Sequence, residues 1–324
     1  MLNNKKILVT GGTGSFGREL IKYLLKNFPK IKKLVIFSRD ELKQYEMSKT
    51  YNVSKYPSIR YFIGDIRDKD RVDMALKDID YVIHAAALKQ VDTAEYNPFE
   101  TIKTNVVGTQ NIIESCLNNN VKKMIALSTD KAVSPFNLYG ATKLCAEKLV
   151  VSANNIKGKN PIIFSIVRYG NVLGSRGSVL PAFQKQKKKN ILYITDENMT
   201  RFNISLRESI KLVLWTLKNS KGGEIFIPKL PTIKITDLAK AVCEKCKIKI
   251  IGIRPGEKIH EELISEYESQ YLYDFGNCYG ILNFADKRLR KTKINSRFSY
   301  NSKENKNYLS IAQIKKILSM YEAN

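Results

Sequence analysis

A tyrosine and a lysine four positions apart form a pair that can move a proton. Tyr139 and Lys143 would share one face of a helix at this spacing. A cationic lysine beside a phenol lowers the pKa of the phenol toward the working range. Tyr139 could then accept a hydroxyl proton while hydride leaves the same carbon, and Thr129 could hydrogen-bond to that hydroxyl. This pattern indicates a dehydrogenase-type oxidation.

An acid and a base directly follow Thr129 in the sequence. Asp130 can protonate a departing hydroxyl, and Lys131 can remove a carbon-bound proton. A simple oxidation requires neither group, so the pair predicts that water is eliminated as well. The alternative is an ion pair on the surface of a loop.

A glycine-rich turn near the N-terminus predicts a dinucleotide site. Gly11, Gly14 and Gly17 follow an apolar run and open a helical pattern. Such a turn lets the backbone approach a pyrophosphate, which the N–H groups of the helix N-terminus then bind. A P-loop has similar glycine spacing, but Arg18 and Glu19 stand where that motif needs Lys and Ser or Thr. This excludes the NTPase interpretation.

Charged residues after the second and third apolar runs indicate which dinucleotide is bound. Arg39 stands about where an NAD enzyme carries an acidic residue, and favours the extra phosphate of NADP. Asp40 and Lys43 could add ribose or phosphate contacts, or could be a solvated pair. Asp65 could accept from the adenine amino group, or could cap a helix.

Apolar runs alternate with helical patterns through the first half of the chain. This predicts an α/β fold with a Rossmann-type, doubly wound parallel sheet and a second, smaller α/β lobe. We expect the dinucleotide-binding domain at residues 1–171 and 203–230, and the substrate domain at residues 172–202 and 231–324. We expect residues 290–307 to be mobile, because they are polar and rich in Lys and Asn. The runs expected to be strands are Lys6–Thr10, Lys33–Ser38, Ile59–Ile63, Tyr81–Ala85, Lys123–Ser128, Ile162–Arg168 and Glu224–Ile227, and the clearest helices are Arg18–Lys26, Leu206–Asn219 and Ile311–Tyr321.

The composition indicates in which compartment the protein lies and which partners it can bind. The net charge of +24 raises a nucleic-acid interpretation, but the lysines are scattered and no nucleic-acid motif organises them. No signal peptide or membrane span is apparent, so we expect a cytoplasmic protein. Five cysteines at irregular spacing make no disulfide framework. We expect Cys243 and Cys246 to lie on a helix face and expect no metal, because a structural zinc site needs four ligands.

Seven motifs carry a resemblance to a known family. They are GGTGSFG, HAAALKQV, LSTDKA, YGATK, RYGNVLGSRGS, MTRF and RPGEK. With them the chain resembles the extended short-chain dehydrogenase/reductase family. Within it the chain is most similar to the short UDP-N-acetylglucosamine 4,6-dehydratases that invert carbon 5. The resemblance extends from about Lys5 to Glu268.

The resemblance implies roles for further residues. Those implied at the NADP site are Thr13, Ser15, Phe16 and Gly17 at the pyrophosphate, Ile66 beside Asp65, and Ala85, Lys89 and Thr104 at the nicotinamide ribose. Those implied at the nucleotide-sugar site are Lys89, Asn171, the loop 174–179 with Val179, Arg201 and Arg254 at the diphosphate, and Glu257 at the uridine ribose. For Lys89 and Arg201 a generic surface cation is the alternative.

The resemblance also implies a reaction. Carbon 4 is oxidised through NADP with Tyr139 as base, Lys131 removes the carbon-5 proton, Asp130 assists loss of water, and hydride returns to carbon 6. Rival interpretations are a dehydratase that retains carbon 5, a UDP-hexose 4-epimerase, and a nucleotide- or RNA-binding Rossmann protein without turnover. We expect a homo-oligomer, a dimer or a hexamer, with no nucleic-acid or membrane partner.

Overall fold

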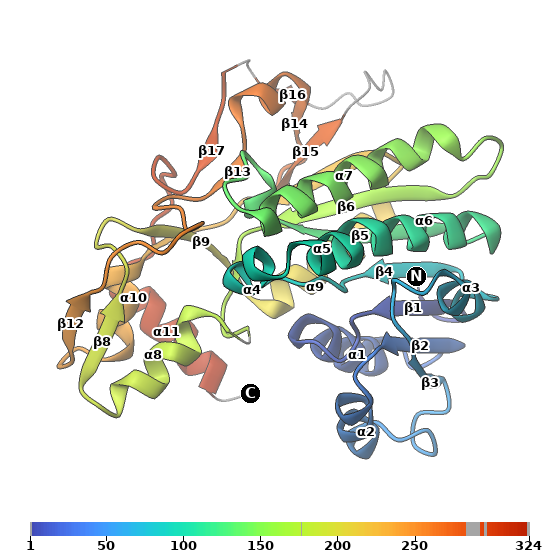
Figure 1. The fold of residues 1–324 in the computed structure, drawn as a ribbon, viewed down its shortest axis with the longest axis horizontal. Helices are drawn as coiled ribbons and strands as arrows, with labels where there is room; N and C mark the ends of the chain where they lie inside the picture. Colours follow the sequence, from blue (N-terminus) through green and yellow to red (C-terminus); the bar gives the residue numbers. More distant parts are fainter. Residues whose placement is uncertain (1, 176, 283–291, 295–296, 323–324) are drawn as a thin grey trace.

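The structure, a computed structural model, describes residues 2–175, 177–282, 292–294 and 297–322. Within these residues one large sheet runs through the molecule (Figure 1). Its order is β16-β14-β15-β10-β6-β5-β4-β1-β2-β3. Its strands are β1 (Lys6–Thr10), β2 (Lys33–Ser38), β3 (Ile59–Ile63), β4 (Tyr81–His84), β5 (Lys123–Thr129), β6 (Ile163–Tyr169), β10 (Glu224–Pro228), β14 (Leu272–Asp274), β15 (Cys278–Leu282) and β16 (Thr292–Lys293).

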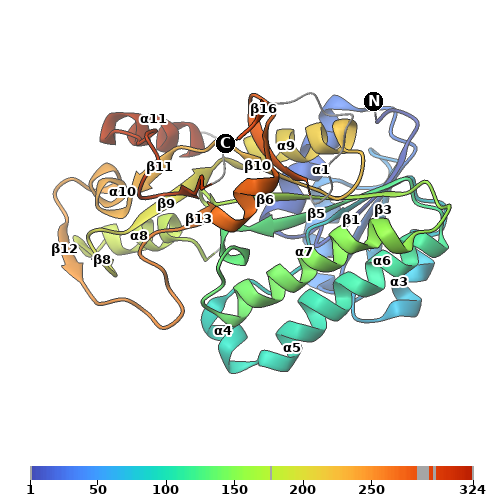
Figure 2. The same ribbon diagram turned by 90° about the horizontal axis from the view of Figure 1, so that it is seen from above.

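The strands from β3 to β10 pair in parallel, which confirms the predicted α/β fold. The order reverses direction at β1, as in a doubly wound sheet, and crossover helices cover both faces. Figure 2 shows α1 and α9 on one face and α3, α6 and α7 on the other. These helices are α1 (Ser15–Asn27), α2 (Glu41–Thr50), α3 (Lys69–Leu76), α4 (Val91–Tyr96), α5 (Pro98–Ile102), α6 (Gly108–Asn118), α7 (Leu138–Ile156) and α9 (Leu206–Asn219).

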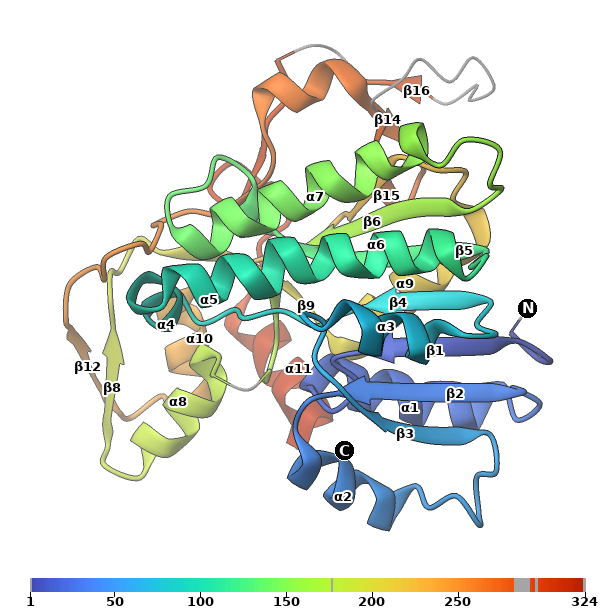
Figure 3. The same ribbon diagram turned by 45° about the vertical axis from the view of Figure 1, so that its right-hand side comes forward.

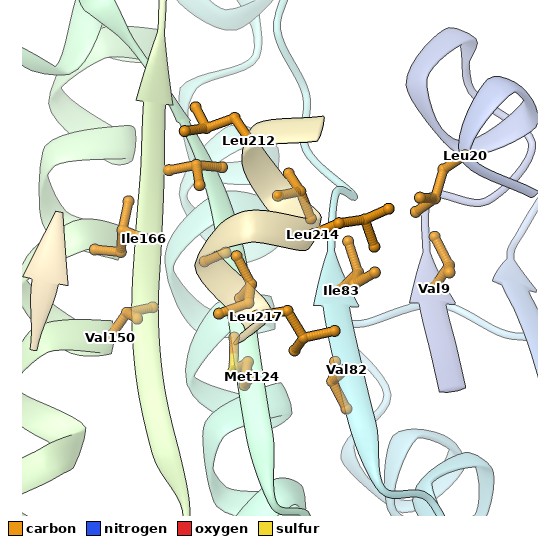
Figure 4. Close-up of a cluster of buried hydrophobic side chains, with 14 of the residues drawn as sticks. Val9, Leu20, Val82, Ile83, Met124, Val150, Ile166, Leu212, Leu214 and Leu217 are labelled. Carbon is orange, nitrogen blue, oxygen red and sulfur yellow. The ribbon is translucent and has the colours of Figure 1, made fainter. Parts of the chain in front are cut away.

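The main core lies between the sheet and its helices. In Figure 4, Leu212, Leu214 and Leu217 of α9 pack beside Ile83 and other side chains of the central strands. These residues are at most 9 % exposed. The central strands are almost continuously apolar because both of their faces are covered.

The smaller lobe has its own core. Leu180, Leu192, Ile235 and Ile314 belong to this second buried cluster. The lobe lies beside the carboxyl ends of the central strands (Figure 3). Its elements are β7 (Asn171–Val172), α8 (Val179–Lys187), β8 (Ile191–Ile194), β9 (Thr200–Ile204), β11 (Thr232–Lys234), α10 (Ile235–Val242), β12 (Lys247–Ile250) and α11 (Ile311–Glu322).

The C-terminal segment departs from the expected division. Strands β14, β15 and β16 pair antiparallel onto the edge of the large sheet beside β10, although residues 231–324 were assigned to the substrate lobe. The segment also contains β13 (Glu262–Ile264), which pairs with β17 (Tyr300–Asn301). Tyr300 and Ser302 are buried, so the prediction of mobility is wrong for the part around them. Residues 290–291 and 295–296 of that prediction lie outside the described residues.

The cysteine prediction also needs correction. Helix α10 ends at Val242, so Cys243 and Cys246 lie beyond it and not on a helix face. They form a disulfide, which the three-residue separation permits because the chain turns between α10 and β12. Among the described residues, none of the helices has the length and apolar character that crossing a membrane requires.

Candidate active site

A cleft with a volume of about 760 Å³ lies at the carboxyl ends of the parallel strands, between the sheet and the smaller lobe. This is where open α/β sheets bind ligands, at the point where the strand order reverses. The cleft is lined by most of the predicted site residues, namely Gly11, Gly14, Ser15, Phe16, Gly17, Ala85, Lys89, Thr129, Asp130, Lys131, Tyr139, Lys143, Asn171, Val179, Arg201, Arg254 and Glu257. Those outside its lining are Thr13, Arg39, Asp40, Lys43, Asp65, Ile66 and Thr104.

Thr129 ends β5, and Asp130 and Lys131 lie in η2 (Asp130–Ala132), a 3-10 helix of one turn that follows it. The Thr129 hydroxyl donates to Asp130 Oδ1 at 2.9 Å, and the backbone N–H of Lys131 donates to the Thr129 hydroxyl at 3.4 Å. Lys131 Nζ donates to Asp130 Oδ1 at 3.2 Å. The Asp130 side chain is 1 % exposed, so the two residues are not the surface ion pair considered as the alternative.

The protonation of this pair is set by burial and by a second carboxylate. Burial raises the pKa of Asp130, and the charge of Glu261 adds to this effect. Burial by itself would lower the pKa of Lys131, but the charges of Asp130 and Glu261 outweigh it and hold that pKa above its usual value. Lys131 is therefore an ammonium ion in the resting protein, and Asp130 accepts a proton more readily than an ordinary carboxylate.

Helix α7 brings Tyr139 to the same point. Asn137 caps the helix by accepting from the N–H of Gly140 at 2.8 Å. Gly140 lets the helix lie directly on η2, since a Cβ there would be 2.2 Å from the carbonyl oxygen of Lys131. Tyr139 is hydrogen-bonded to Thr129. Tyr139 and Thr129 therefore both present a hydroxyl to the cleft.

The expected partnership of Tyr139 with Lys143 is corrected in one respect. Burial raises the pKa of Tyr139 to about 12, and the cation that opposes this rise is Lys131. Lys143 Nζ donates instead to the carbonyl oxygen of Leu127 at 2.7 Å, and burial lowers the pKa of Lys143 to about 8. Lys143 therefore anchors α7 to β5, and the cation that lowers the pKa of the phenol is Lys131.

The glycine turn has the form that a dinucleotide requires. Gly11 has a φ of +64°, and the N–H of Gly14 donates to its carbonyl oxygen at 2.9 Å. At Gly17, which lies in the first turn of α1, a Cβ would lie 2.6 Å from the backbone of Gly11 and Gly12. Thr13 faces inward and hydrogen-bonds to Ser38 at the end of β2. The glycines therefore let α1 begin tightly against the turn, and its N-terminus lies at the cleft.

The residues expected around the adenosine have local partners. Asp40 caps α2 by accepting from the N–H of Lys43, and the two side chains also form an ion pair, as in the structural alternative. Asp65 binds Arg67, and it lies 3.6 Å from Arg39. Asp65 is not a helix cap, because Asp68 holds that place for α3. The Arg39 side chain is 53 % exposed, so it can reach a ligand.

Several buried oxygen atoms on the predicted ligand residues have no hydrogen-bond partner in the described structure. They include Thr104 Oγ1, Asn171 Oδ1 and Glu257 Oε2. Thr104 lies in a π-turn (Lys103–Val107), a distortion that often marks functional positions in helices. Ile66, in contrast, packs against Gly108 in the core. Unsatisfied buried oxygens are costly, so the two positions that line the cleft, Asn171 and Glu257, fit a polar ligand.

The predicted diphosphate cations differ in their surroundings. Arg201 on β9 is 5 % exposed, and its guanidinium donates to the carbonyl oxygens of Thr200, Lys258 and Ile259 at 2.8 to 2.9 Å. The surface-cation alternative is therefore wrong for Arg201. Arg254, in contrast, is exposed at the cleft. Lys89 also lines the cleft, and burial lowers its pKa. Residue 176 of the predicted loop lies outside the described residues.

Sequence reasoning missed Glu261. It lines the cleft, and its Oε1 lies 3.0 Å from Lys131 Nζ and 3.7 Å from Arg201 Nε. The only signal for it was its place four residues after Glu257, just beyond the RPGEK segment. The two histidines have structural partners, since His84 hydrogen-bonds to Thr10 and Thr109 in the core and His260 hydrogen-bonds to Thr200.

Comparisons with known proteins confirm the predicted resemblance. The family model described as "Polysaccharide biosynthesis protein" matches residues 7–283. The inverting UDP-N-acetylglucosamine 4,6-dehydratase of Campylobacter jejuni is 51 % identical, over 99 % of both chains. A UDP-glucose 4-epimerase of Rickettsia bellii is 42 % identical, over 98 % of this chain and 96 % of the relative. An X-ray structure of Pen from Bacillus thuringiensis superposes with a TM-score of 0.93 at 37 % identity, covering 100 % of both chains.

Proposed function

Because the chain belongs to the polysaccharide biosynthesis protein family, we propose that it is a UDP-N-acetylglucosamine 4,6-dehydratase that inverts carbon 5. The observation that carries the proposal is the buried Asp130–Lys131 pair beside Tyr139 in one cleft. The C. jejuni relative supports the choice of substrate. The product would be UDP-2-acetamido-2,6-dideoxy-β-L-arabino-hex-4-ulose, for the biosynthesis of deoxy-amino sugars.

The chain's residues fit a nicotinamide dinucleotide. The N-terminus of α1, which lines the cleft with Gly14, Ser15 and Gly17, would receive its pyrophosphate, and Ala85 just after β4 would face its nicotinamide ribose. Arg39, exposed beside the end of β2, supports NADP over NAD. When bound, the nicotinamide would take hydride from carbon 4 and return it to carbon 6.

Tyr139 and Thr129 would govern the oxidation. The Thr129 hydroxyl would hold the carbon-4 hydroxyl, and Tyr139 would accept its proton as hydride leaves. Since burial raises the pKa of Tyr139 to about 12, that pKa has to fall for the phenol to act as a base. Lys131 is the cation that already acts in this direction.

Asp130 and Lys131 would perform the elimination through one internal proton shift. Transfer of a proton from the Lys131 ammonium to Asp130, across 3.2 Å, gives a neutral amine and a carboxylic acid. The amine then removes the carbon-5 proton, and the electron pair of that C–H bond forms a double bond between carbons 5 and 6. The carbon-6 hydroxyl leaves with the Asp130 proton as water. Lys131 ends as ammonium and Asp130 as carboxylate, so the resting charges are restored.

Product analysis after incubation with UDP-N-acetylglucosamine tests this proposal. Loss of one water from the mass of the sugar nucleotide is the expected result. Unchanged mass with a new stereoisomer would indicate a 4-epimerase instead, the activity for which the R. bellii relative is named. An unchanged substrate would leave only a binding function and contradict the proposal.

A further inference from the structure

Glu261 is a charged side chain in the cleft to which the proposed reaction gives no role. Its side chain is 3 % exposed and its Oε1 is 3.0 Å from Lys131 Nζ. Lys131 Nζ therefore lies between two carboxylates, Glu261 and Asp130. Among the described residues Glu261 Oε2 has no hydrogen-bond partner, which leaves this carboxylate half-satisfied inside the cleft.

Glu261 is held in place from two sides. Its backbone N–H donates to the Ser302 hydroxyl at 2.9 Å, and its carbonyl oxygen accepts from the Ser302 N–H at 2.7 Å. Ser302 is fully buried and also bonds Thr200, the neighbour of Arg201. The C-terminal segment thus fixes the backbone of Glu261, and Arg201 stands beside its carboxylate.

We propose that Glu261 is a positioning residue that fixes the Lys131 amine beside Asp130 for the elimination step. This inference rests on the proposed dehydratase function. With one carboxylate on each side, the ammonium group is held at the point from which its proton passes to Asp130. After the carbon-5 proton has been taken, Glu261 stabilises the ammonium ion that results.

The surrounding charges favour an ionised Glu261. Burial opposes ionisation, but Lys131, Arg201 and Lys258 outweigh it and hold the pKa of Glu261 below its usual value. Glu261 in turn raises the pKa of both Asp130 and Lys131. The groups that face Lys131 from the elements around it are Asp130 on η2, Tyr139 on α7, Arg201 on β9, Lys89 after β4 and Glu261 before β13.

The test is Glu261→Gln, which keeps the shape of the side chain and removes its charge. Glu262→Gln is the matched control, because Glu262 is adjacent and carries the same charge. In the part of the chain that the structure describes, its carboxylate accepts hydrogen bonds from Ser134 and Ser299 and lies away from Lys131. We expect Glu261→Gln to form reduced cofactor from UDP-N-acetylglucosamine at the wild-type rate. We expect the rate of water release to fall by about 100-fold, which is the low end of the rate loss on removing a positioned acid or base.

Three results would overturn the role of Glu261. They are turnover in Glu261→Gln equal to that of Glu262→Gln, an equal loss in the oxidation and elimination steps, and an unchanged pH profile of water release. Thermal unfolding of both variants shows whether they fold, and Glu261→Asp, which restores the charge on a shorter side chain, should recover part of the rate.

A ligand-free measurement separates this inference from the proposed function. Magnetic resonance of isotope-labelled lysine side chains, with Lys131→Arg identifying the signal, should show that the pKa of Lys131 falls in Glu261→Gln and not in Glu262→Gln. An unchanged Lys131 titration would contradict the positioning role even if the wild type dehydrates its substrate. If the wild type does not dehydrate UDP-N-acetylglucosamine, this titration still decides whether Glu261 holds Lys131.

Discussion

At the scale of single residues, burial gives ordinary side chains the protonation states that acid–base chemistry needs. Asp130 is 1 % exposed and has a raised pKa, while Lys131 is kept cationic by two neighbouring carboxylates. A pair of this kind titrates as a unit, because each charge depends on the other. One proton moving over 3.2 Å changes the pair from an ion pair to a working acid and base.

Tyr139→Phe removes the hydroxyl and leaves the shape of the side chain unchanged. We expect both ligands to bind normally and kcat to fall by roughly 10²- to 10⁴-fold, the usual contribution of a positioned base. The measurement is kcat beside the dissociation constants of cofactor and substrate. A variant with nearly normal kcat would exclude Tyr139 as the base.

His84→Gln tests a buried neutral histidine. Its folded pKa is about 3, because burial disfavours the charged ring and Lys143 adds to this effect. The ordinary value is about 6.5, so the unfolded chain binds more protons between these pH values, and stability is lost as pH falls through this window. We expect this slope, at most about 1.4 kcal/mol per pH unit, to disappear in the variant.

The measurement for His84 is the free energy of unfolding, from denaturant titrations at about pH 4, 5, 6 and 7, because these pH values span the window between the two pKa values. Wild type and variant should differ in slope as well as in offset. Equal slopes for the two proteins would show that His84 is not a neutral buried group.

The site residues that could be predicted from sequence are those whose types carry the chemistry. Thr129, Asp130, Lys131 and Tyr139 meet in one cleft as their spacing indicated. Glu261 could not be found in this way, because it reaches Lys131 across 130 positions through tertiary packing. For the same reason the sequence did not show that Lys143 Nζ binds the carbonyl oxygen of Leu127.

At the scale of elements, the unit β5–η2–α7 brings together the groups proposed to be catalytic. The strand ends at Thr129, the single turn of η2 presents Asp130 and Lys131, and α7 begins at Leu138 under its Asn137 cap. The expected strands were confirmed to within one residue at either end, because apolar runs bounded by turns are strong local signals. The antiparallel edge was missed, since it pairs residues distant in sequence through main-chain hydrogen bonds.

Arg39→Ala tests the turn between β2 and α2. Removing the guanidinium should weaken NADP binding by roughly tenfold or more, as loss of a charge-assisted hydrogen bond of about 1.5 to 3 kcal/mol implies, and should leave NAD binding nearly unchanged. Calorimetric titration with each dinucleotide measures the two affinities. Lys49→Ala, on the exposed C-terminal turn of α2, is the control. Equal losses for both dinucleotides, or tighter NAD binding in the wild type, would overturn the NADP assignment.

At the scale of the whole molecule, a buried ion network joins the sheet to the C-terminal segment. Arg168 on β6 is fully buried and binds Glu147 of α7 through two nitrogens at 2.6 and 2.9 Å. It also binds Glu268, in the 3-10 helix η3 (Glu266–Tyr271), at 2.8 and 3.0 Å. The segment that supplies Glu261 and Ser302 is thus fastened to the core beside the cleft.

Glu147→Gln should destabilise the fold, because it leaves Arg168 without its fully buried partner. We expect a loss of about 3 kcal/mol in the free energy of unfolding, the lower range for breaking one side of a buried pair. Glu266→Gln, at an exposed position in η3, should change the free energy of unfolding by less than about 0.5 kcal/mol. Denaturant titration of both variants measures the two free energies of unfolding. Equal values would show that the Arg168–Glu147 ion pair does not stabilise the fold.

The proposed function depends most directly on what happens at carbon 5. Nuclear magnetic resonance of the product formed from UDP-N-acetylglucosamine in deuterated water reports both the proton exchange and the configuration. If Lys131 removes the carbon-5 proton and the product is reprotonated from the opposite face, the first product should carry deuterium at carbon 5 and have the L-arabino configuration. A first product with the D-xylo configuration, or with the original hydrogen still on carbon 5, would contradict the inverting mechanism.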